Sequence, residues 1–313
     1  MNPSVAIIIL NWNNATDTLA CLESVFQMDY PNFSVLVVDN GSTDDSVAQF
    51  QSVYPDLDLL LTGDNLGYAG GNNAGISKAL ASSAEYICIL NNDTVVEPAF
   101  LSALVQEMDA DSRTGVVGPM TYFYDPPSTI FSAGCDIDWR RGIVHHRGMG
   151  ILADDKVPSD LAEAQDVDAI AGCGFLVSRA AIDRAGYFDP TYFLNFEDID
   201  WCVRIARCGF RVRYVPAARL YHKVSATQGQ DSPATTYYMT RNALWFFGRH
   251  SLRRLLALTS ILYRTARTVG AWTLKPRYHD EKFRQHRRAT MQAVSDFFRR
   301  KTGPAALPPN KAL

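Results

Sequence analysis

The sequence of 313 residues is 47% hydrophobic and 20% charged, which is typical of a globular protein with one large domain or one domain plus an extension. Its net charge of −3 combines an acidic part, residues 1–234 with net charge −16, and a basic part, residues 235–313 with net charge +13. The acidic body argues against a nucleic-acid-binding protein, and the basic part predicts an anionic partner surface such as acidic lipid.

The cysteines and the N-terminus indicate a cytoplasmic protein. Six cysteines are present without a CxxC pair or zinc-like spacing, so we expect reduced, mostly buried thiols. The N-terminus, MNPSVAIIILNWNN, has no basic segment, and its apolar run is too short for a signal peptide. We therefore expect a first β-strand and a cytoplasmic location, with any membrane association being peripheral on the inner face of the cell membrane.

The first 120 residues alternate between apolar runs and segments with helical spacing. Helical spacing occurs in Thr16 to Gln27, Asp44 to Val53 and Ala69 to Ser82. Continuous apolar strands that alternate with helices predict an α/β fold with a mostly parallel sheet covered on both faces. The runs expected to form buried strands are 5–10, 34–39, 57–61, 86–90 and 115–119.

Asn, Asp and Gly residues follow four of these strands in succession. One polar strand end is explained by a turn or a helix N-cap, and Asn91-Asn92-Asp93 alone is compatible with a turn or a metal site. Four such ends meet at the carboxyl edge, where α/β sheets bind ligands. We therefore expect a polar ligand in this crevice.

Residues 121–168 are irregular and predict hairpins and loops over the crevice. The pair His145-His146 suggests a metal site, but adjacent strand residues point to opposite faces, so we interpret the pair as surface or acceptor-contacting residues. Residues 172–190 predict a strand, a helix and a turn. The next segment predicts a helix that begins with acids and ends with arginines, which suits the helix dipole but does not explain why the acids follow the aromatic loop YFLNF.

Together these segments resemble the inverting family-2 glycosyltransferases with the GT-A fold, and within them the rhamnosyltransferase-like branch. The resemblance spans about residues 4–245. It implies a catalytic domain over 1–234 with a Rossmann-like nucleotide-binding half, followed by a mostly helical extension over 235–313. The matching segments, in the order of the family, are IIILNWNN, VVDNGSTDDS, NLGYAGGNNAGI, LNNDT, AGCGFLVSR, GYFDPTYFLNFEDIDWCVRIARCGF, YVPAARLYHKVSAT and YYMTRNAL.

The resemblance implies transfer of a sugar, with rhamnose favoured, from a dTDP- or UDP-sugar to a hydroxyl of a glycan or lipid-linked acceptor in cell-surface polysaccharide synthesis. Asp39 is expected to accept a hydrogen bond from the imide N–H of uracil or thymine, and glycines are expected to let the backbone approach the donor closely. The expected nucleotide-sugar-binding residues are Asn11, Asn13, Asp39, Gly41, Asn65, Gly70, Gly71, Asn73, Asn91, Asn92 and Asp93.

The resemblance also implies a Mg²⁺ or Mn²⁺ site. Asp93 is the last position of the DxD-like motif, and His222 matches a histidine that completes the metal site in this branch. Such an ion would neutralise charge on the leaving diphosphate. Asn91 stands where the family often has Asp, so we expect weak, water-rich coordination.

Asp198 matches the second acid of the family's ED motif, and we expect it to be the catalytic base that takes the acceptor proton. Glu197 is expected to orient the acceptor or the base, and Arg204 to pair with the acids across helical turns. One base is sufficient, since inversion proceeds in a single displacement. The expected acceptor-contacting residues are Gly172, Cys173, Trp201 and Arg241.

The basic C-terminal part contains no transmembrane span, because arginines interrupt its apolar run. Two interpretations stay open: a basic amphipathic helix at a membrane surface, or a helix packed on the catalytic domain with its arginines in solvent. We expect the last ten residues, rich in Pro and Ala, to be disordered. On a helical projection Arg249, Arg253, Arg264 and Arg267 fall opposite Leu255, Leu258, Leu262 and Val269.

Other classes of protein fit less well. A dinucleotide-binding oxidoreductase needs GxGxxG after the first strand, and a nucleotidyltransferase needs a basic glycine-rich loop there, but this position holds NWNNAT. A non-catalytic nucleotide-sugar or lipid-binding module of the same fold is the alternative, although it would need neither Asp93 nor Asp198. A homo-oligomer is compatible with the sequence.

Overall fold

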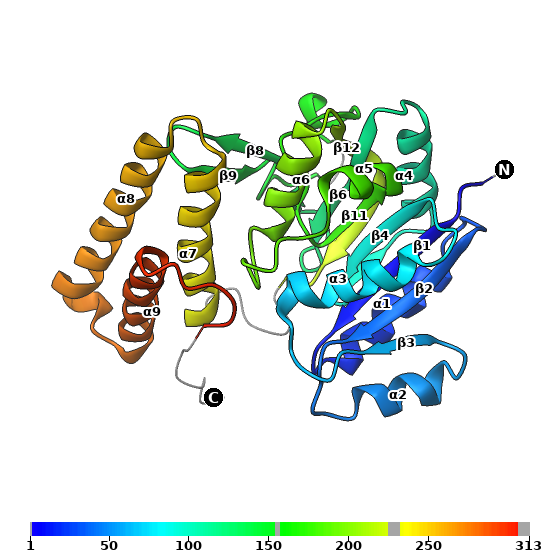
Figure 1. Cartoon of the computed structure of the whole chain (residues 1–313), viewed down its shortest axis with the longest axis horizontal. Helices are drawn as coiled ribbons and strands as arrows, with labels where there is room; N and C mark the ends of the chain where they lie inside the picture. The colour runs from blue at the N-terminus through cyan, green and yellow to red at the C-terminus, as the bar shows by residue number, and fades with distance from the viewer. Residues whose placement is uncertain (1, 154–156, 225–231, 306–313) are drawn as a thin grey trace.

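The computed structural model describes residues 2–153, 157–224 and 232–305. Within these ranges ten strands form one mixed sheet with helices packed on it (Figure 1). The strand order is β10-β12-β6-β11-β4-β1-β2-β3, with β5 beside β12 and β7 beside β6. The strands are β1 Val5–Asn11, β2 Phe33–Asp39, β3 Asp58–Leu61, β4 Tyr86–Asn91, β5 Thr94–Val96, β6 Thr114–Phe123, β7 Ile130–Ser132, β10 Gln165–Asp166, β11 Gly174–Ser178 and β12 Arg211–His222.

The half of the sheet from β4 to β3 is parallel, so its carboxyl ends lie along one edge. β1 pairs in parallel with both β2 and β4, and β2 pairs in parallel with β3. The register places Asn11 opposite Asp39, and Leu10 opposite Asn91, so three strands end at the same level. β11 then pairs antiparallel with β4 and β6, and β12 pairs in parallel with β6.

Helices cover both faces of the sheet because its strands are apolar on both sides. Ile7 and Ile9 of β1 belong to the core under α1 and α4, whereas Ile8 belongs to the core under α3, α5 and α6. The predicted α/β fold with a mostly parallel central sheet is thereby confirmed. The helices of this part are α1 Ala15–Phe26, α2 Ser46–Val53, α3 Gly67–Leu80, α4 Phe100–Asp109, α5 Arg179–Ala185 and α6 Glu197–Arg207.

The segment 121–168 contains the predicted hairpin. β8 Cys135–Asp138 and β9 Ile143–His146 form a separate two-stranded sheet, and a 3₁₀ turn follows at Ser159–Leu161. His145 is exposed, whereas the His146 ring turns inward, with Nδ1 3.7 Å from the Cys135 thiol. The opposite orientation of the two histidines agrees with strand geometry. All six cysteines are free thiols, as expected, and five of them are buried.

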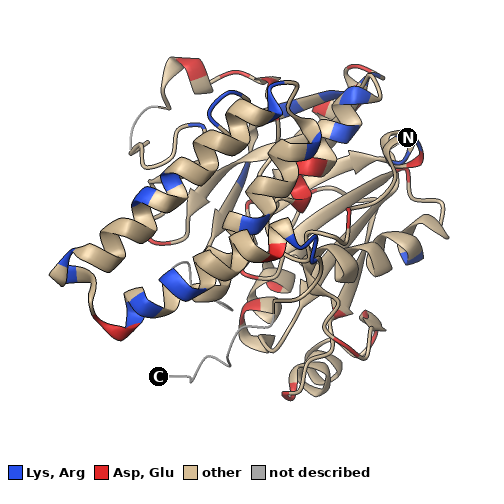
Figure 2. Cartoon of the chain, turned by 60° about the vertical axis from the view of Figure 1, so that its left-hand side comes forward, with Lys and Arg blue, Asp and Glu red and all other residues tan. Residues whose placement is uncertain are grey.

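Three long helices form the C-terminal part: α7 Pro233–His250, α8 Arg254–Leu274 and α9 Glu281–Phe298, with a 3₁₀ turn at Pro276–Tyr278 before α9. Figure 2 shows Lys and Arg along these helices and few acids. None of the described helices is both long enough and apolar enough to cross a membrane. The predicted disorder concerns mainly residues 306–313, which lie outside the described residues.

The C-terminal helices share a hydrophobic core with the sheet. Phe246 and Phe247 of α7 and Ile261 of α8 belong to the same cluster as Ile8 of β1. The proposed boundary at residue 234 therefore does not separate two cores.

The single helical projection of this part is wrong, because the helix ends at His250 and a new one begins at Arg254. Arg249 forms an ion pair with Asp189 and does not share a face with the arginines of α8.

Candidate active site

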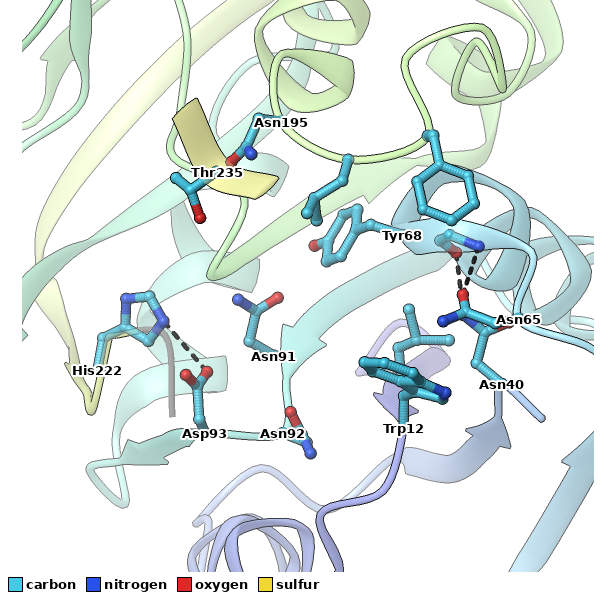
Figure 3. A pocket seen from close by; sticks show the side chains of 14 residues that line it. Trp12, Asn40, Asn65, Tyr68, Asn91, Asn92, Asp93, Asn195, His222 and Thr235 are labelled. Atoms are coloured by element: carbon cyan, nitrogen blue, oxygen red, sulfur yellow. Dashed lines mark hydrogen bonds and ion pairs between the residues drawn. The ribbon is translucent and has the colours of Figure 1, made fainter. Parts of the chain in front are cut away.

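The polar strand ends lie around one pocket. A cavity of about 250 Å³ opens at the carboxyl ends of β1 and β4, beside the N-terminus of α3. Asp93 and His222 lie together on one side of it, and Trp12, Asn40 and Asn65 lie on the other (Figure 3). The cavity is lined by Leu10, Trp12, Asn40, Asn65, Gly67, Tyr68, Asn91, Asn92, Asp93, Phe193, Leu194, Asn195, His222 and Thr235.

A network of buried side chains lies beneath the pocket and fixes the strand ends. Asn11 Nδ2 donates to Asp39 Oδ1 at 2.9 Å and to the Ser42 hydroxyl at 3.1 Å. Thr18 Oγ1 donates to Asn11 Oδ1 at 2.8 Å and accepts from Asn92 Nδ2 at 2.9 Å. Neither Asn11 nor Asp39 is among the described residues that line the cavity. They hold the strand ends in place, and their contact with a donor stays a prediction.

Two further predicted donor residues shape the loop after β2. Asn13 Oδ1 accepts from the backbone N–H groups of Thr43 at 2.7 Å and Asp44 at 3.3 Å. Gly41 has φ of +72°, and a Cβ there would lie 2.6 Å from the carbonyl carbon of Asp64. Only glycine fits this position, because other residues would meet both backbone strain and a clash.

Asn40 and Asn65 fix the loop that precedes α3. Asn40 Nδ2 donates to Asn65 Oδ1 at 3.2 Å and to the Gly67 carbonyl at 3.1 Å. Asn40 Oδ1 accepts from the Leu66 N–H at 3.1 Å, and Asn65 Oδ1 accepts from the Gly67 N–H at 2.8 Å. This side of the pocket is therefore preorganised, with both amide groups held in one orientation.

Gly70 and Gly71 permit close packing of α3 and do not border the cavity. A Cβ on Gly71 would lie 2.5 Å from Leu10 Cδ1, and a Cβ on Gly70 would lie 2.8 Å from Leu66 Cβ. The prediction that these two glycines admit the donor is therefore replaced by a packing role.

Asp93 and His222 come together because β5 pairs with the end of β12. Thr94 is the register partner of His222, and the Asp93 carbonyl accepts from the Lys223 N–H at 2.9 Å. His222 Nε2 lies 3.1 Å from Asp93 Oδ1. Both side chains are buried and line the cavity.

The residues around this pair fit a divalent cation. Asn91 Oδ1 and His222 Nδ1 are buried and have no hydrogen-bond partner among the described residues. Carboxylate, imidazole and amide oxygen are donor types that Mg²⁺ or Mn²⁺ accept. In the described ranges no three His, Cys, Asp or Glu side chains gather into a complete metal site. Such an ion would therefore take further ligands from a bound diphosphate and from water.

Two carboxyl groups at the start of α6 have strongly raised pKa values. Asp198 Oδ2 accepts from the Gly172 N–H at 2.7 Å, and Oδ1 accepts from the Ile199 N–H at 2.8 Å. Burial raises the pKa of Asp198 from 3.8 to about 6, although these backbone hydrogen bonds lower it. Burial and then the Asp198 charge raise the pKa of Glu197 well above 4.5. Neighbouring carboxyls with raised pKa values are typical of acid–base sites.

Tyr68 links the cavity to Asp198. Its hydroxyl donates to the Gly172 carbonyl at 2.6 Å, and the N–H of the same glycine donates to Asp198. A Cβ on Gly172 would lie 2.9 Å from Asp198 Oδ2, so the backbone approaches the carboxylate directly. Burial, then Glu197 and Asp198, raise the pKa of Tyr68 well above 10. The tyrosine is therefore a neutral donor at the edge of the acidic pair.

The YFLNF loop, Tyr192–Phe196, has an unusual backbone. Phe193, Asn195 and Phe196 have φ values of +62°, +66° and +75°. Left-handed conformations at non-glycine residues cost of order 1–3 kcal/mol each and occur mainly at functional sites. Phe193 and Asn195 line the cavity, and the Phe193 carbonyl accepts from the Tyr68 N–H at 2.7 Å.

Asn242 and Arg241 of α7 hold this loop in its strained form. Asn242 Nδ2 lies within hydrogen-bonding distance of three loop carbonyls, those of Tyr192 at 2.9 Å, Leu194 at 2.7 Å and Asn195 at 2.8 Å. Arg241 donates to the Tyr192 carbonyl at 3.0 Å. Both side chains are fully buried. We call these two residues the α7 clamp.

The position of Arg241 corrects one prediction. Its guanidinium also donates to the Gly303 carbonyl at 2.8 Å and lies over the rings of Tyr237 and Tyr238. Because it is 0% exposed, it is not available to an acceptor phosphate. The residue supports the pocket from behind.

Arg204 and Trp201 also point away from the pocket. Arg204 pairs with Asp200 at 2.7 Å across one helical turn, as expected, and donates to backbone carbonyls before α6. Trp201 is fully buried and donates Nε1–H to the Gly186 carbonyl at 2.6 Å. Neither is in a position to act on an acceptor in the cavity, so the expected catalytic and acceptor roles do not fit this geometry.

Cys173 and Asn73 lie behind the pocket lining and hydrogen-bond to neighbouring backbone. The Cys173 carbonyl accepts from the Asn91 N–H at 2.9 Å. Asn73 bonds both backbone groups of Phe188, donating to its carbonyl at 2.9 Å and accepting from its N–H at 3.0 Å. Both residues were predicted to contact ligands, and the structure gives them supporting roles.

Nine residues that line the cavity were not among the predicted site residues, and five of these nine carry a polar side-chain group. Trp12 and Asn40 stand in the same strand-end motifs as the predicted ones, and the sequence contained the signal for them. Tyr68, Asn195 and Thr235 reach the cavity from α3, the YFLNF loop and α7. No spacing rule in the sequence predicts that these three segments meet.

Comparisons with known proteins agree with this fold. A solved mannosyltransferase from Pyrobaculum calidifontis, in complex with GDP-Man and Mn²⁺, superposes with a TM-score of 0.59 at 16% identity. The match covers 96% of this chain and 88% of that chain, and the shared fold is the GT-A fold of glycosyltransferases. The sequence model described as "Glycosyl transferase family 2" matches residues 6–182. The chain therefore belongs to glycosyl transferase family 2 and is a glycosyltransferase.

The curated relatives place it in the rhamnosyltransferase-like branch of that family. An N-acetylglucosaminyl-diphospho-decaprenol L-rhamnosyltransferase of Mycobacterium tuberculosis is 29% identical over 70% of this chain and 76% of its own length. A dTDP-rhamnosyl transferase of Shigella flexneri is 23% identical over 86% of this chain and 88% of its own length.

Proposed function

We propose that the protein transfers rhamnose from a dTDP- or UDP-sugar to a hydroxyl of a glycan or lipid-linked acceptor, with inversion at the anomeric carbon. The observation that carries this proposal is one cavity that has a cation-compatible pair, Asp93 and His222, on one side and the Asp198 carboxylate behind its Tyr68 wall. The names of the Mycobacterium and Shigella relatives support rhamnose as the transferred sugar.

In the proposed reaction Asp198 takes the proton of the acceptor hydroxyl. The acceptor oxygen forms a bond to the anomeric carbon while the bond from that carbon to the diphosphate breaks, and the nucleoside diphosphate leaves with the electron pair. The Gly172 and Ile199 N–H groups orient the carboxylate, and the raised pKa of Glu197 favours its neutral form, which limits repulsion of the Asp198 charge.

Asp93 and His222 would hold a Mg²⁺ or Mn²⁺ ion. The neutral Asn91 Oδ1 would contact this ion or the ribose of the sugar nucleotide. When bound, the ion supplies charge neutralisation for the diphosphate. The opposite side of the cavity, with Trp12, Asn40 and Asn65, would take the nucleoside, because an indole ring and fixed amides suit stacking and hydrogen bonding to a base. Asp39 lies under this side and could accept from the base only through a lone pair left by Asn11 and Ser42.

The nucleotide proposal is tested by calorimetric titration with dTDP and UDP, each with and without Mn²⁺. We expect binding in all four cases and tighter binding with Mn²⁺. The variant Asp93→Asn should lose most of the gain from Mn²⁺, because a carboxylate ligand becomes a neutral amide of the same size. The ratio of dTDP to UDP affinity ranks the two donor types.

The matched control is Asp56→Asn, which removes the same charge from an exposed position. It should bind nucleotide and Mn²⁺ as the wild type does. Metal-independent binding by the wild type would contradict the metal role of Asp93. If neither nucleotide binds under any condition, the donor proposal fails and the non-catalytic module becomes the better description.

The raised pKa of Asp198 predicts the pH dependence of turnover. A carboxylate acts as a base only when ionised, so kcat should fall as the pH drops through about 6. Rates measured from about pH 5 to pH 9 at saturating donor test this prediction. A rate that stays constant down to pH 5 would mean that the base has an ordinary carboxyl pKa, and would exclude Asp198 in this environment.

A further inference from the structure

The outward face of α8 carries large apolar side chains in one line. Leu256 is 55% exposed, Tyr263 67% and Leu274 79%. With Arg267 they recur at spacings of seven, four and seven residues, which places all four on one side of an α-helix. We call Leu256, Tyr263, Arg267 and Leu274 the α8 outer stripe. Large apolar side chains gathered on one exposed face mark a surface for interaction.

The opposite face of α8 is fixed to the protein. Ala257 and Ile261 are buried in the core shared with the sheet. Arg264 donates to the carbonyls of Arg141 at 2.6 Å and Gly142 at 2.9 Å in the turn between β8 and β9. The helix therefore cannot rotate to hide its outer stripe. The two readings of the sequence, packing and exposure of an amphipathic helix, apply to opposite faces of the same helix.

The charge around the stripe has one sign. Residues 251–279 contain no Asp or Glu, and their basic residues are Arg253, Arg254, Arg264, Arg267, Lys275 and Arg277. Arg140 and Arg141 are exposed in the adjacent turn, and with Leu256 and Tyr263 they border a shallow groove of about 480 Å³. Figure 2 shows this basic side of the molecule turned forward.

We propose that the α8 outer stripe docks on an anionic phospholipid bilayer, with Leu256, Tyr263 and Leu274 in the interface and the arginines at the lipid phosphates. Leucine and tyrosine side chains gain free energy by leaving water, and each nearby Lys or Arg adds roughly 1 kcal/mol at an anionic surface. The acidic body, net −16 over residues 1–234, would be repelled, so the charge distribution also selects the face. This inference rests on the proposed function, because membrane binding would bring the enzyme to a lipid-linked acceptor.

The test is co-sedimentation of the full chain with vesicles. We expect binding to vesicles of mixed phosphatidylcholine and phosphatidylglycerol, weaker binding at high salt, and little binding to phosphatidylcholine alone. The double variant Leu256→Glu/Tyr263→Glu should lower the partition coefficient at least ~10-fold, because two apolar contacts become anionic. The control Leu61→Glu changes an exposed leucine of β3, 58% exposed, and should bind as the wild type does.

Two results would overturn the proposal. One is a double variant that partitions like the wild type. The other is a dimer that light scattering detects for the wild type but not for the double variant. A second copy of the protein would then cover the stripe. Nucleotide titration of the same double variant should match the wild type, because neither residue lines the active-site cavity. Loss of vesicle binding is thereby distinguished from failure of the donor proposal, which would abolish nucleotide binding in the wild type.

Discussion

Replacing Asp198 with asparagine is expected to lower kcat by ~10²–10⁴-fold while nucleotide binding stays close to the wild type. The amide keeps the size of the carboxylate but cannot take a proton from the acceptor hydroxyl. It also keeps one acceptor oxygen for the Gly172 N–H, so the wall formed by Gly172 and Tyr68 should be retained. Initial rates with saturating donor and acceptor, together with the calorimetric titration, measure the two effects separately.

Asp183→Asn is the matched control for this substitution. Asp183 lies exposed on α5 and should tolerate the same loss of charge without a change in rate. A second variant, Asp198→Ala, removes the side chain and should be equally slow. Wild-type turnover in Asp198→Asn would show that another group takes the proton, and Glu197 would then be the next candidate.

Replacing Asn242 with aspartate should destabilise the folded protein by about 1–3 kcal/mol and should also impair catalysis, because the loop carbonyls lose their donor. Arg241 Nε, which donates to Asn242 Oδ1 at 3.0 Å, offsets part of the new charge. The substitution changes no heavy-atom positions but puts a buried carboxylate against the carbonyls of Tyr192, Leu194 and Asn195. Those carbonyls belong to the YFLNF loop, whose left-handed residues depend on the α7 clamp. Urea unfolding at neutral pH measures the loss of stability.

The same variant contains its own internal check. Lowering the pH protonates the new carboxyl, which then offers one O–H donor to the loop, so its stability relative to the wild type should partly recover in acid. Asn32→Asp provides a control, because Asn32 is exposed and donates to a single carbonyl, that of Asn2 at 2.8 Å. Equal stability changes at positions 242 and 32 would contradict the clamp.

The sequence predicts the location of the pocket because the signal there is local. The run VAIIIL is followed by Asn11, and the run YICIL is followed by Asn91. The first polar residue after each apolar run therefore marks the end of a strand. Parallel pairing then brings those ends to one edge. The same reasoning located Asp93, whereas the acids at the start of α6 were assigned to the site through the resemblance to the family.

The distinction between residues that line the pocket and residues that support it could not be predicted. Asn40 lines the cavity whereas its neighbour Asp39 does not, because successive side chains at a strand end point in opposite directions. Arg241 resembled a phosphate ligand in the sequence, yet its partners include carbonyls about fifty residues earlier and sixty residues later in the chain. Contacts over such distances depend on packing that no local pattern encodes.

The α7 clamp couples the C-terminal helices to the shape of the pocket, because the loop that it holds lines the cavity. A chimera of two relatives joined at residue 234 would combine the YFLNF loop from one parent with the clamp residues from the other, and the hydrogen bonds between them could then be lost. A chimera should therefore take the loop, the clamp and the α7 aromatic residues that reach the core of the sheet from the same parent. Variants that alter this side of the pocket should therefore keep the YFLNF loop and the α7 clamp from the same parent.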